Sequence, residues 1–151
     1  MRAKITPAEM EATIRGYFDA CNAGNYKALI ACFTEDAVHY FPHGLPDVPW
    51  RGADRIARGW IWCVETFGSR WTIEKVLCSS TAPEAVIEWT HWKTSLKTVL
   101  RGDEWYVFDE PSGRISEIRA FYASAPDRSV SVNELPGFDY SARGYSLRAP
   151  G

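Results

Sequence analysis

The stretch 104–122, EWYVFDEPSGRISEIRAFY, contains the two runs that decide the fold. Apolar and polar residues alternate on both sides of Pro111-Ser112-Gly113, which is a turn signature. The alternation predicts two long strands, over about 97–109 and 114–124, joined as an antiparallel pair. The same period of two continues upstream and predicts two more strands, at about 70–80 and 84–95.

Helical spacing dominates the part of the chain ahead of these strands. Thr6-Pro7-Ala8-Glu9 is typical of a helix start with a capping box, and Asn22-Ala23-Gly24 is expected to end that helix. A second, short helix is predicted from about Tyr26 to Phe33. A third is expected to begin with Asp54 as its cap and to end at Gly68.

One strand is expected between the second and third helices. It covers Ala37–Phe41, after the helix end and turn predicted at FTEDA, and a loop rich in proline and glycine follows from Pro42 to Arg51. Three helices with one strand among them, followed by a run of antiparallel strands, predict an α+β fold. We expect a curved, mostly antiparallel sheet wrapped around the helices, with a cone-shaped cavity between the layers.

The alternation ends near residue 124. We therefore expect one domain over 1–124 and an extended C-terminal tail over 125–151. The tail keeps three aromatic residues, which favours docking on the domain over a mobile terminus; they are Phe138, Tyr140 and Tyr145.

Composition narrows the function classes. The net charge is −2 and the pI is about 5.9, so the chain lacks the basic face that nucleic-acid binding requires. No apolar stretch is long enough to span a bilayer, and the first residues lack the apolar core of a signal peptide. We expect a cytoplasmic protein with no membrane partner. Its four cysteines stand in apolar patterns without a C-x-x-C spacing, as buried thiols do.

Four motifs in order resemble the NTF2-like superfamily, in particular its SnoaL-like and ketosteroid-isomerase-like branches. They are YFDACNAGNYKALIACFTEDA (17–37), a strand ending at a proline, RGADRIARGW (51–60), and the stretch 104–122. The resemblance implies the cone fold described above. It also implies a homodimer, because proteins of this superfamily often pair through the outer face of the sheet.

The resemblance to ketosteroid isomerases assigns roles to single positions. Tyr17 matches the phenol that donates to the substrate's enolate oxygen, and Glu104 matches the protonated acid beside it. Three positions match aromatic residues of the pocket wall: Phe33, Trp60 and Tyr122. The family's base is an Asp directly before the proline of the first strand, where this chain has Phe41. The steroid isomerase reaction is therefore not implied.

Strand alternation extends the candidate site. Residue 39 shares a face with residue 41, so His39 enters the cavity if Phe41 does. On the strand predicted at about 84–95, one face carries Ile87, Trp89 and His91. The resemblance puts that face inside. The third histidine, His43, lies in the Pro/Gly loop, where a solvated position is favoured over a place in a lid.

These residue types suit proton transfer. An imidazole titrates near neutral pH, and a Tyr or Glu among aromatic rings favours its neutral, proton-donating form. We therefore expect Tyr17, His39, His91 and Glu104 to act as acids and bases. The aromatic wall favours an aromatic or polycyclic small-molecule substrate, held by Phe33, Phe41, Trp60, Ile87, Trp89 and Tyr122.

Each assignment has a structural alternative. Tyr17 suits a helix core, and Glu104 suits a salt bridge with Arg101 or Arg119 on the outer face. Arg119 itself is expected to point outward, as is Glu88 together with Thr90. The alternative for four tryptophans is that they cover the outer face of the sheet at a dimer contact; they are Trp62, Trp71, Trp92 and Trp105.

Three functions remain open at this point. The leading hypothesis is a lyase that needs no cofactor and works by dehydration or retro-aldol elimination; related proton transfers serve isomerases and polyketide cyclases. Among superfamily members, dehydratases resembling scytalone dehydratase use tyrosines with two histidines. A metal site made of His39, His91 and Glu104 is a second hypothesis. A non-catalytic module that binds small molecules is the third.

Overall fold

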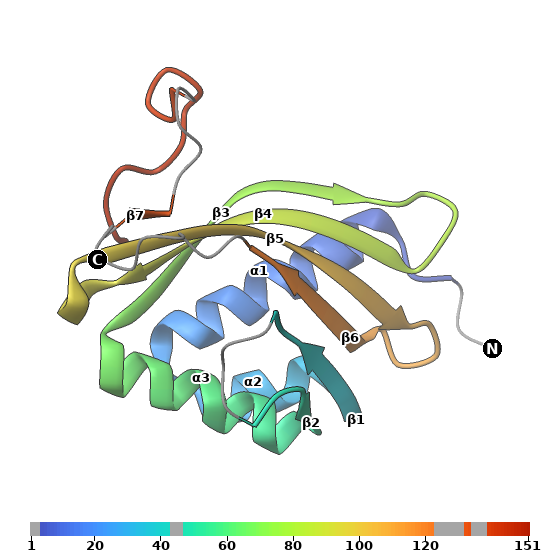
Figure 1. Cartoon of the computed structure of the whole chain (residues 1–151). Coiled ribbons are helices and arrows are strands. Elements are labelled where there is room, and N and C mark those ends of the chain that lie inside the picture. The colour runs from blue at the N-terminus through green and yellow to red at the C-terminus, as the bar shows by residue number, and fades with distance from the viewer. Residues whose placement is uncertain (1–3, 43–46, 123–131, 134–138) are drawn as a thin grey trace.

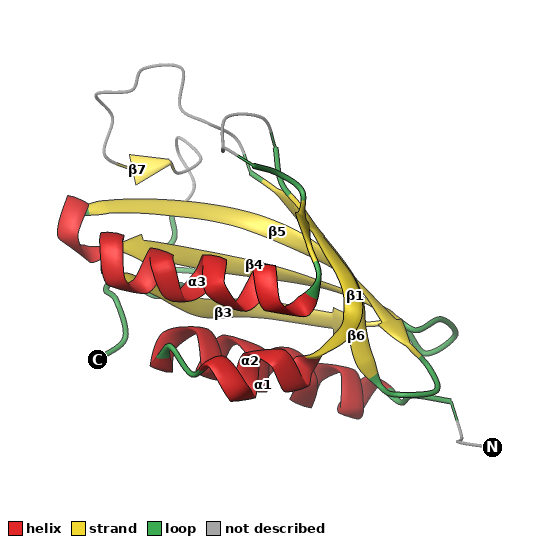
Figure 2. Cartoon of the chain, turned by 90° about the horizontal axis from the view of Figure 1, so that it is seen from below, coloured by secondary structure: helices red, strands yellow, loops and turns green. Residues whose placement is uncertain are grey.

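The computed structural model describes residues 4–42, 47–122, 132–133 and 139–151. His43 and Phe138 lie outside these residues. The predicted α+β fold is confirmed: a curved sheet arches over three helices, as Figures 1 and 2 show. Within the described part, no helix is long and apolar enough to cross a membrane.

The three helices begin and end near the predicted residues. Helix α1 (Pro7–Ala23) has the expected capping box between Thr6 and Glu9, and α2 covers Tyr26–Cys32. Gly24 ends α1 in the left-handed region with φ of 60°, and Gly68 ends α3 (Ala53–Phe67) at 61°. The cap predicted at Asp54 is wrong. Gly52 is the N-cap, and Asp54 sits in the first turn, where it accepts from Arg58 and Tyr26.

Six strands form one continuous path in the order β2-β1-β6-β5-β4-β3. Neighbours are antiparallel except β1 and β6, which run parallel. A further short strand, β7, pairs with β5. The bounds are Phe33–Tyr40 for β1, Trp50–Arg51 for β2, Ser69–Cys78 for β3, Glu84–Lys93 for β4, Thr98–Asp109 for β5, Arg114–Phe121 for β6 and Val132–Asn133 for β7.

Two strand boundaries differ from the prediction. Strand β1 begins at Phe33 rather than at Ala37, because Phe33 already pairs with Ile115 of β6; the register then shifts before Val38. Strand β2 lies inside the predicted loop, where Trp50 pairs with His39. Both differences arise from contacts between distant segments, which local periodicity does not report.

The core lies between the helices and the inner face of the sheet. Its largest fully buried side chains come from every layer: Tyr17, Tyr106, Phe33, Met10, Ile14, Leu29, Ile56, Ile87, Ile115 and Ile118. Helix α1 packs mainly on β3, and α3 on β1. Because the helices cover the sheet unevenly, room is left between α1, α3 and strands β3 to β6.

The C-terminal residues that the structure describes contact the outer face of the sheet. The Tyr140 ring lies 4.3 Å from the Arg101 guanidinium, and the Tyr145 hydroxyl donates to Glu88. The backbone N–H of Ser146 donates to Glu74 at 3.3 Å. Thr90 points outward, as predicted. It is nevertheless fully buried, because this segment covers it.

Candidate functional site

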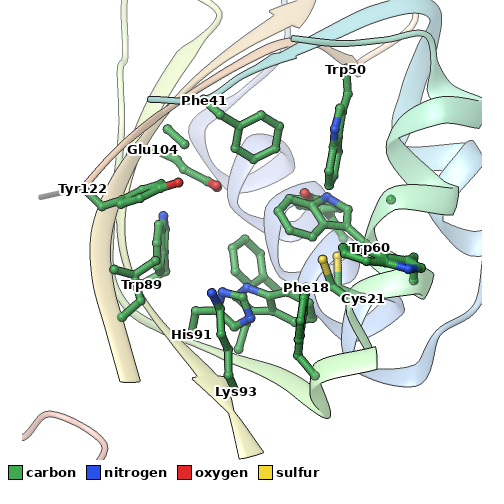
Figure 3. A pocket seen from close by; sticks show the side chains of 18 of the residues that line it. Phe18, Cys21, Phe41, Trp50, Trp60, Trp89, His91, Lys93, Glu104 and Tyr122 are labelled. Atoms are coloured by element: carbon green, nitrogen blue, oxygen red, sulfur yellow. The ribbon is translucent and has the colours of Figure 1, made fainter. Parts of the chain in front are cut away.

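A cavity of about 610 Å³ opens between the inner face of the sheet and helices α1 and α3. Figure 3 shows its wall of aromatic rings around a few polar groups. Ten of the lining side chains carry the argument below: Tyr17, Phe41, Trp50, Trp60, Cys63, Trp71, Trp89, His91, Glu104 and Tyr122. Such a cavity, apolar with few polar groups, is typical of a small-molecule site.

Glu104 is the carboxyl group in the depth of this cavity. It projects inward from β5 with 5% of its surface exposed, so the alternative of an outer-face salt bridge is wrong. Its Oε2 accepts a short hydrogen bond from the Tyr106 hydroxyl, and its Oε1 lies 3.5 Å from His39 Nε2. Strand β6 lies between β1, which carries His39, and β5, which carries Glu104. Its inward residue beside Glu104 is Ala120, whose small side chain leaves the carboxyl group room to reach His39.

His39 faces inward, as the strand alternation predicts, but it does not line the cavity among the described residues. It is fully buried: Phe41 stacks on it at 4.0 Å, and the edge of Trp60 packs against it at 5.4 Å. The expectation that His39 projects into the cavity is therefore wrong, because these two rings cover it. Among the residues that the structure describes, Glu104 is the cavity-lining side chain within ion-pair distance of His39 Nε2.

The contacts of His39 determine where protons can lie. Its Nδ1 is 3.2 Å from the carbonyl oxygen of Tyr40. A carbonyl oxygen only accepts, so this contact requires a proton on Nδ1. Nε2 then faces Glu104 Oε1 at 3.5 Å, which is an ion-pair distance, and Nε2 has no hydrogen-bond partner among the described residues. A proton on Nε2 makes this contact a buried ion pair, and a proton on Oε1 makes both groups neutral.

Two buried phenols flank Glu104. Burial raises the pKa of Tyr17 well above its ordinary value of 10.0, and the nearby Cys21 and Glu104 add to the rise. Burial, followed by the charge of Glu104, raises the pKa of Tyr106 in the same way. Both hydroxyls are thus proton donors at neutral pH. Tyr17 lines the cavity. Tyr106 lies behind Glu104 and is not one of the described residues that line the cavity.

His91 lines another part of the cavity. Its Nε2 lies 2.8 Å from the Ser69 hydroxyl, and its ring stacks on Trp71 at 4.6 Å. Burial, with a contribution from the Lys93 charge, lowers the pKa of His91 to about 3, so the imidazole is neutral. It stands four residues along β4 from Ile87, the residue paired with Glu104, which is roughly 13 Å at 3.3 Å per residue. His91 and Glu104 therefore do not converge on one atom.

The predicted wall residues divide into two layers. Phe41, Trp60, Trp89 and Tyr122 line the cavity. Phe33 and Ile87 do not, and the structure corrects both assignments. Phe33 packs under Tyr17 with ring centroids 5.1 Å apart, and Ile87 is buried in the inner layer of the sheet.

Other lining residues were not predicted as part of the site. Trp71 was considered for the outer face, but its register opposite His91 turns it inward. Trp50 was placed in a loop, yet it pairs with His39 and reaches the cavity. The expected inward position of His91 was a usable signal that Trp71, its partner on β3, faces inward as well. No local signal marks Trp50, Arg55 or Lys93.

Two glycines make room for the tryptophan rings. A Cβ at Gly59 of α3 would lie 2.5 Å from the Trp50 ring. A Cβ at Gly102 of β5 would lie 2.6 Å from the Trp89 ring and 2.7 Å from the Phe121 carbonyl. Any larger residue would move a ring of the wall. The shape of the cavity is thus set partly by Gly59, which lines it, and by Gly102, which is not among its lining residues.

Two indole N–H groups of the wall, those of Trp50 and Trp89, are buried and have no hydrogen-bond acceptor among the described residues. The buried Trp60 N–H is a third donor, and it interacts with the Tyr17 hydroxyl, whose pKa it lowers against the larger effect of burial. A buried donor left unpaired costs about 1–3 kcal/mol, and an indole N–H can only donate. In Figure 3 the Trp89 nitrogen lies at the edge of the ring that faces Tyr122. The cavity therefore offers donors that a ligand with oxygen acceptors would satisfy.

No group of three metal-ligating side chains comes together in the described part of the chain. The proposed set of His39, His91 and Glu104 is divided by the distance along β4. Cys21 and Cys63 also line the cavity, but burial raises the pKa of both thiols, to about 11 for Cys63. Neither is an activated nucleophile.

Residues 14–118 match the SnoaL-like domain family. The chain belongs to this family. No curated protein matches it significantly.

Solved structures agree with this membership. A protein of unknown function with a cystatin-like fold from Methylobium petroleophilum is 47% identical, with 99% of this chain and 98% of that one covered and a TM-score of 0.79. A putative polyketide cyclase from Sinorhizobium meliloti is 15% identical over 78% of this chain and all of that one, with a TM-score of 0.63. A computationally designed 17-OHP binder is 17% identical over 76% and 91%, with a TM-score of 0.66. The last two likenesses show the shared NTF2-like fold.

Proposed function

We propose that this SnoaL-like protein is an acid–base enzyme that needs no cofactor and acts on an aromatic or polycyclic carbonyl compound. The observation that carries the proposal is the pair of Glu104 and His39. A carboxyl group in an apolar cavity lies 3.5 Å from the Nε2 of a fully buried imidazole that is not among the described residues lining the cavity. Neither packing nor charge balance explains this arrangement as well as proton transfer does.

Glu104 is the base in this proposal. When His39 Nε2 carries a proton, the Glu104 carboxylate is ionised and can take a proton from a carbon next to a carbonyl. The electrons of that C–H bond then form the enolate double bond. His39⁺ behind the carboxylate and the Tyr106 hydroxyl hold its orientation.

Tyr17 is the proton donor to the developing enolate oxygen. Its raised pKa keeps the phenol protonated, and it lines the same cavity as Glu104. A donor in a site that excludes water stabilises such charge more strongly than water does. His91 is neutral and stands apart, so we assign it a role in holding the substrate through its ring and not a proton-transfer step.

The proton on Glu104 then has two uses. It can pass to a hydroxyl group on the next carbon, which leaves as water while the enolate electrons form the new double bond. Alternatively it can return at another carbon, which gives an isomerisation. We favour elimination. Cyclisation, the reaction implied by the name of the Sinorhizobium meliloti protein, begins with the same proton removal.

Proton removal can be tested without knowledge of the final product. The protein is incubated in D₂O with 1-tetralone and related bicyclic aryl ketones, and deuterium entry beside the carbonyl is followed by NMR. We expect the wild type to accelerate exchange, and Glu104→Gln to reduce that acceleration at least ~100-fold. The matched control is Glu117→Gln, an outer-face carboxylate paired with Arg119, which should exchange like the wild type.

A second outcome would identify a binding module. The designed 17-OHP binder has the same fold, and an apolar cavity alone is enough to hold a ligand. If ketones of this panel bind, no exchange above the solvent rate is seen with any of them, and Glu104→Gln leaves affinity unchanged, the enzymatic proposal is wrong.

A further inference from the structure

Two inward side chains lie beside Glu104 on the strands that flank it. Glu104 of β5 pairs with Ile87 of β4 and with Ala120 of β6. Trp89 and Tyr122 each follow one of these partners by two residues, so they project to the same side of the sheet as Glu104, and both line the cavity. Diagonal neighbours of this kind are about 7–8 Å apart, which is within reach of aromatic side chains.

A glycine lets the rings of Trp89 and Tyr122 meet. Gly102 of β5 pairs with Trp89, and because the next residue, Asp103, pairs with Phe121, Tyr122 lies on the other side of Gly102. A Cβ at Gly102 would lie 2.6 Å from Trp89 Cζ2, which is on the same long side of the indole as the ring nitrogen Nε1. The centroids of the two rings are 6.1 Å apart, and their planes are at 68°.

Both rings carry a hydrogen-bond donor that has no acceptor in the described part of the chain. Trp89 Nε1 is buried and unpaired, on a side chain that is 4% exposed. The Tyr122 hydroxyl makes no hydrogen bond to a described residue, and burial raises its pKa above the ordinary value of 10.0, so it keeps its proton at neutral pH. In Figure 3 this hydroxyl points into the cavity toward Glu104, and the Trp89 nitrogen lies on the ring edge that faces Tyr122. The Trp89 N–H and the Tyr122 O–H thus form a donor pair beside the carboxyl group.

Along β5, this donor pair and Tyr17 lie on opposite sides of Glu104. Tyr17 comes from α1, and its ring packs on that of Tyr106 with centroids 6.4 Å apart. Tyr106 follows Glu104 by two residues, whereas Gly102, next to the donor pair, precedes it by two. At about 3.3 Å per residue these two rows of the sheet are roughly 13 Å apart. A ligand that reaches from Tyr17 past Glu104 therefore meets a second place for an oxygen atom.

We propose that the substrate is an aromatic or polycyclic ketone with a second acceptor oxygen, which binds to the Trp89 N–H and the Tyr122 hydroxyl. Tyr17 holds the carbonyl oxygen on the other side of Glu104, as in the proposed function, on which this inference rests. The second oxygen is a ketone, ether or hydroxyl oxygen, because an indole N–H can only donate. A ligand without it would leave the buried Trp89 N–H unpaired, so the donor pair discriminates against such a ligand.

The test compares ring systems that differ by a single group. 4-Chromanone and isochroman-4-one each replace one CH₂ of 1-tetralone by an ether oxygen, at two different ring positions, and an ether oxygen can only accept. Isothermal titration calorimetry gives the dissociation constant of each ligand. We expect the wild type to bind at least one of the two ethers about tenfold more tightly than 1-tetralone, as a buried hydrogen bond to an otherwise unpaired donor implies.

Substitutions locate the preference. Tyr122→Phe keeps the ring and removes the hydroxyl; it should bind 1-tetralone as the wild type does and lower the preference for the ether about threefold. The double variant Trp89→Phe, Tyr122→Phe should lose the preference entirely. Tyr40→Phe is the matched control, because that phenol is exposed, and it should keep the preference. Circular dichroism confirms folding, and Tyr122→Phe alone carries the test if the double variant does not fold.

The variant Tyr17→Phe distinguishes the two oxygen positions. It should weaken the binding of all three ligands by a similar factor, because each of them has the carbonyl group that Tyr17 holds. Four results would overturn the inference: no ether bound more tightly than 1-tetralone, an unchanged preference in Tyr122→Phe, loss of the preference in Tyr17→Phe, or no binding of any of the three ligands. Failure of the proposed function looks different. In that case an ether is preferred and the preference depends on Trp89 and Tyr122, but no deuterium exchange occurs with any ketone.

Discussion

The sheet buries a charged cluster on each face, and the two clusters are built differently. On the outer face Arg101 lies 3.8 Å from the Glu74 carboxylate, which also accepts from Thr90 at 2.8 Å and from Ser146. On the inner face Glu104 has one hydrogen bond, from Tyr106, and an imidazole at 3.5 Å. Arg101 and Glu104 are only three residues apart on β5.

The difference separates a structural cluster from a reactive one. The outer carboxylate has several donors and a permanent cation, so its charge is fixed and its role is to hold residues 139–151 against the sheet. The inner carboxyl has a partner that can lose its proton, and it faces open space. Alternation along one strand is enough to put the two environments back to back.

The largest expected effect breaks the outer cluster. Arg101→Met removes the cation and leaves Glu74, whose side chain is 6% exposed, without its ion pair. We expect a loss of about 3–5 kcal/mol in the free energy of unfolding, measured by urea denaturation. Lys97→Met, on the exposed turn after β4, is the control and should change stability by less than about 0.5 kcal/mol. A loss below about 1 kcal/mol for Arg101→Met would contradict the structural role.

A smaller effect distinguishes the inner face by its response to pH. His91 has a pKa of about 3 in the folded protein and 6.5 ordinarily, so the unfolded chain binds more protons between these values. The stability that neutral His91 contributes is therefore constant above about pH 6.5 and falls as the pH drops below it, by up to about 1.4 kcal/mol per unit. His91→Gln, which can still contact Ser69, should flatten this dependence between pH 7.5 and 5.5.

Urea denaturation of both proteins at each pH measures that slope. The variant has a lower baseline stability, because Gln does not stack on Trp71 as the imidazole does, but only the difference in slope bears on the prediction. If the two slopes are equal, other groups cause the acid sensitivity and His91 is not the buried neutral histidine described above.

The smallest expected effect loosens the outer cluster without removing a charge. Tyr145→Phe deletes the hydroxyl that donates to Glu88 and keeps the ring near Arg101. We expect a local cost of about 1 kcal/mol, seen as roughly fivefold faster amide hydrogen exchange at Tyr145 and Ser146. Exchange at His39 should stay unchanged. Faster exchange on both faces would mean that the two clusters are not independent.

The sequence was sufficient for the fold because its signals are local and agree with one another. The capping box at Thr6, the glycines at 24 and 68, and the period of two in the later strands each fix an element by itself. The bounds of β1 and the existence of β2 were beyond reach. They depend on the pairing of Phe33 with Ile115 and of Trp50 with His39, which are contacts between separate segments that local periodicity does not report.

For the site, strand alternation predicted the face of the sheet on which a side chain lies, but not which other side chains pack over it. Together with the family resemblance it put His39 and His91 on the inner face, and the resemblance alone put Glu104 there; all three are buried on that face. It could not show that Phe41 and Trp60 cover His39, or that His91 is some four residues too far along β4 to meet Glu104. Depth and distance come from the packing of whole layers. Arg55 and Lys93, which also line the cavity, were missed for the same reason, since a lone Arg or Lys on a helix or at a strand end is usually solvated.

The parallel pairing of β1 with β6 has a consequence for synthesis. His39 is paired with Ile118, which follows it by 79 positions (118 minus 39), and its contact with Glu104 spans β6. A nascent chain that has left the ribosome only as far as Asp109 already contains both members of the pair but lacks the strand that brings them together. The contact between His39 and Glu104 therefore forms only when β6 docks, and until then the aromatic wall is open to chaperones and to other unfinished chains.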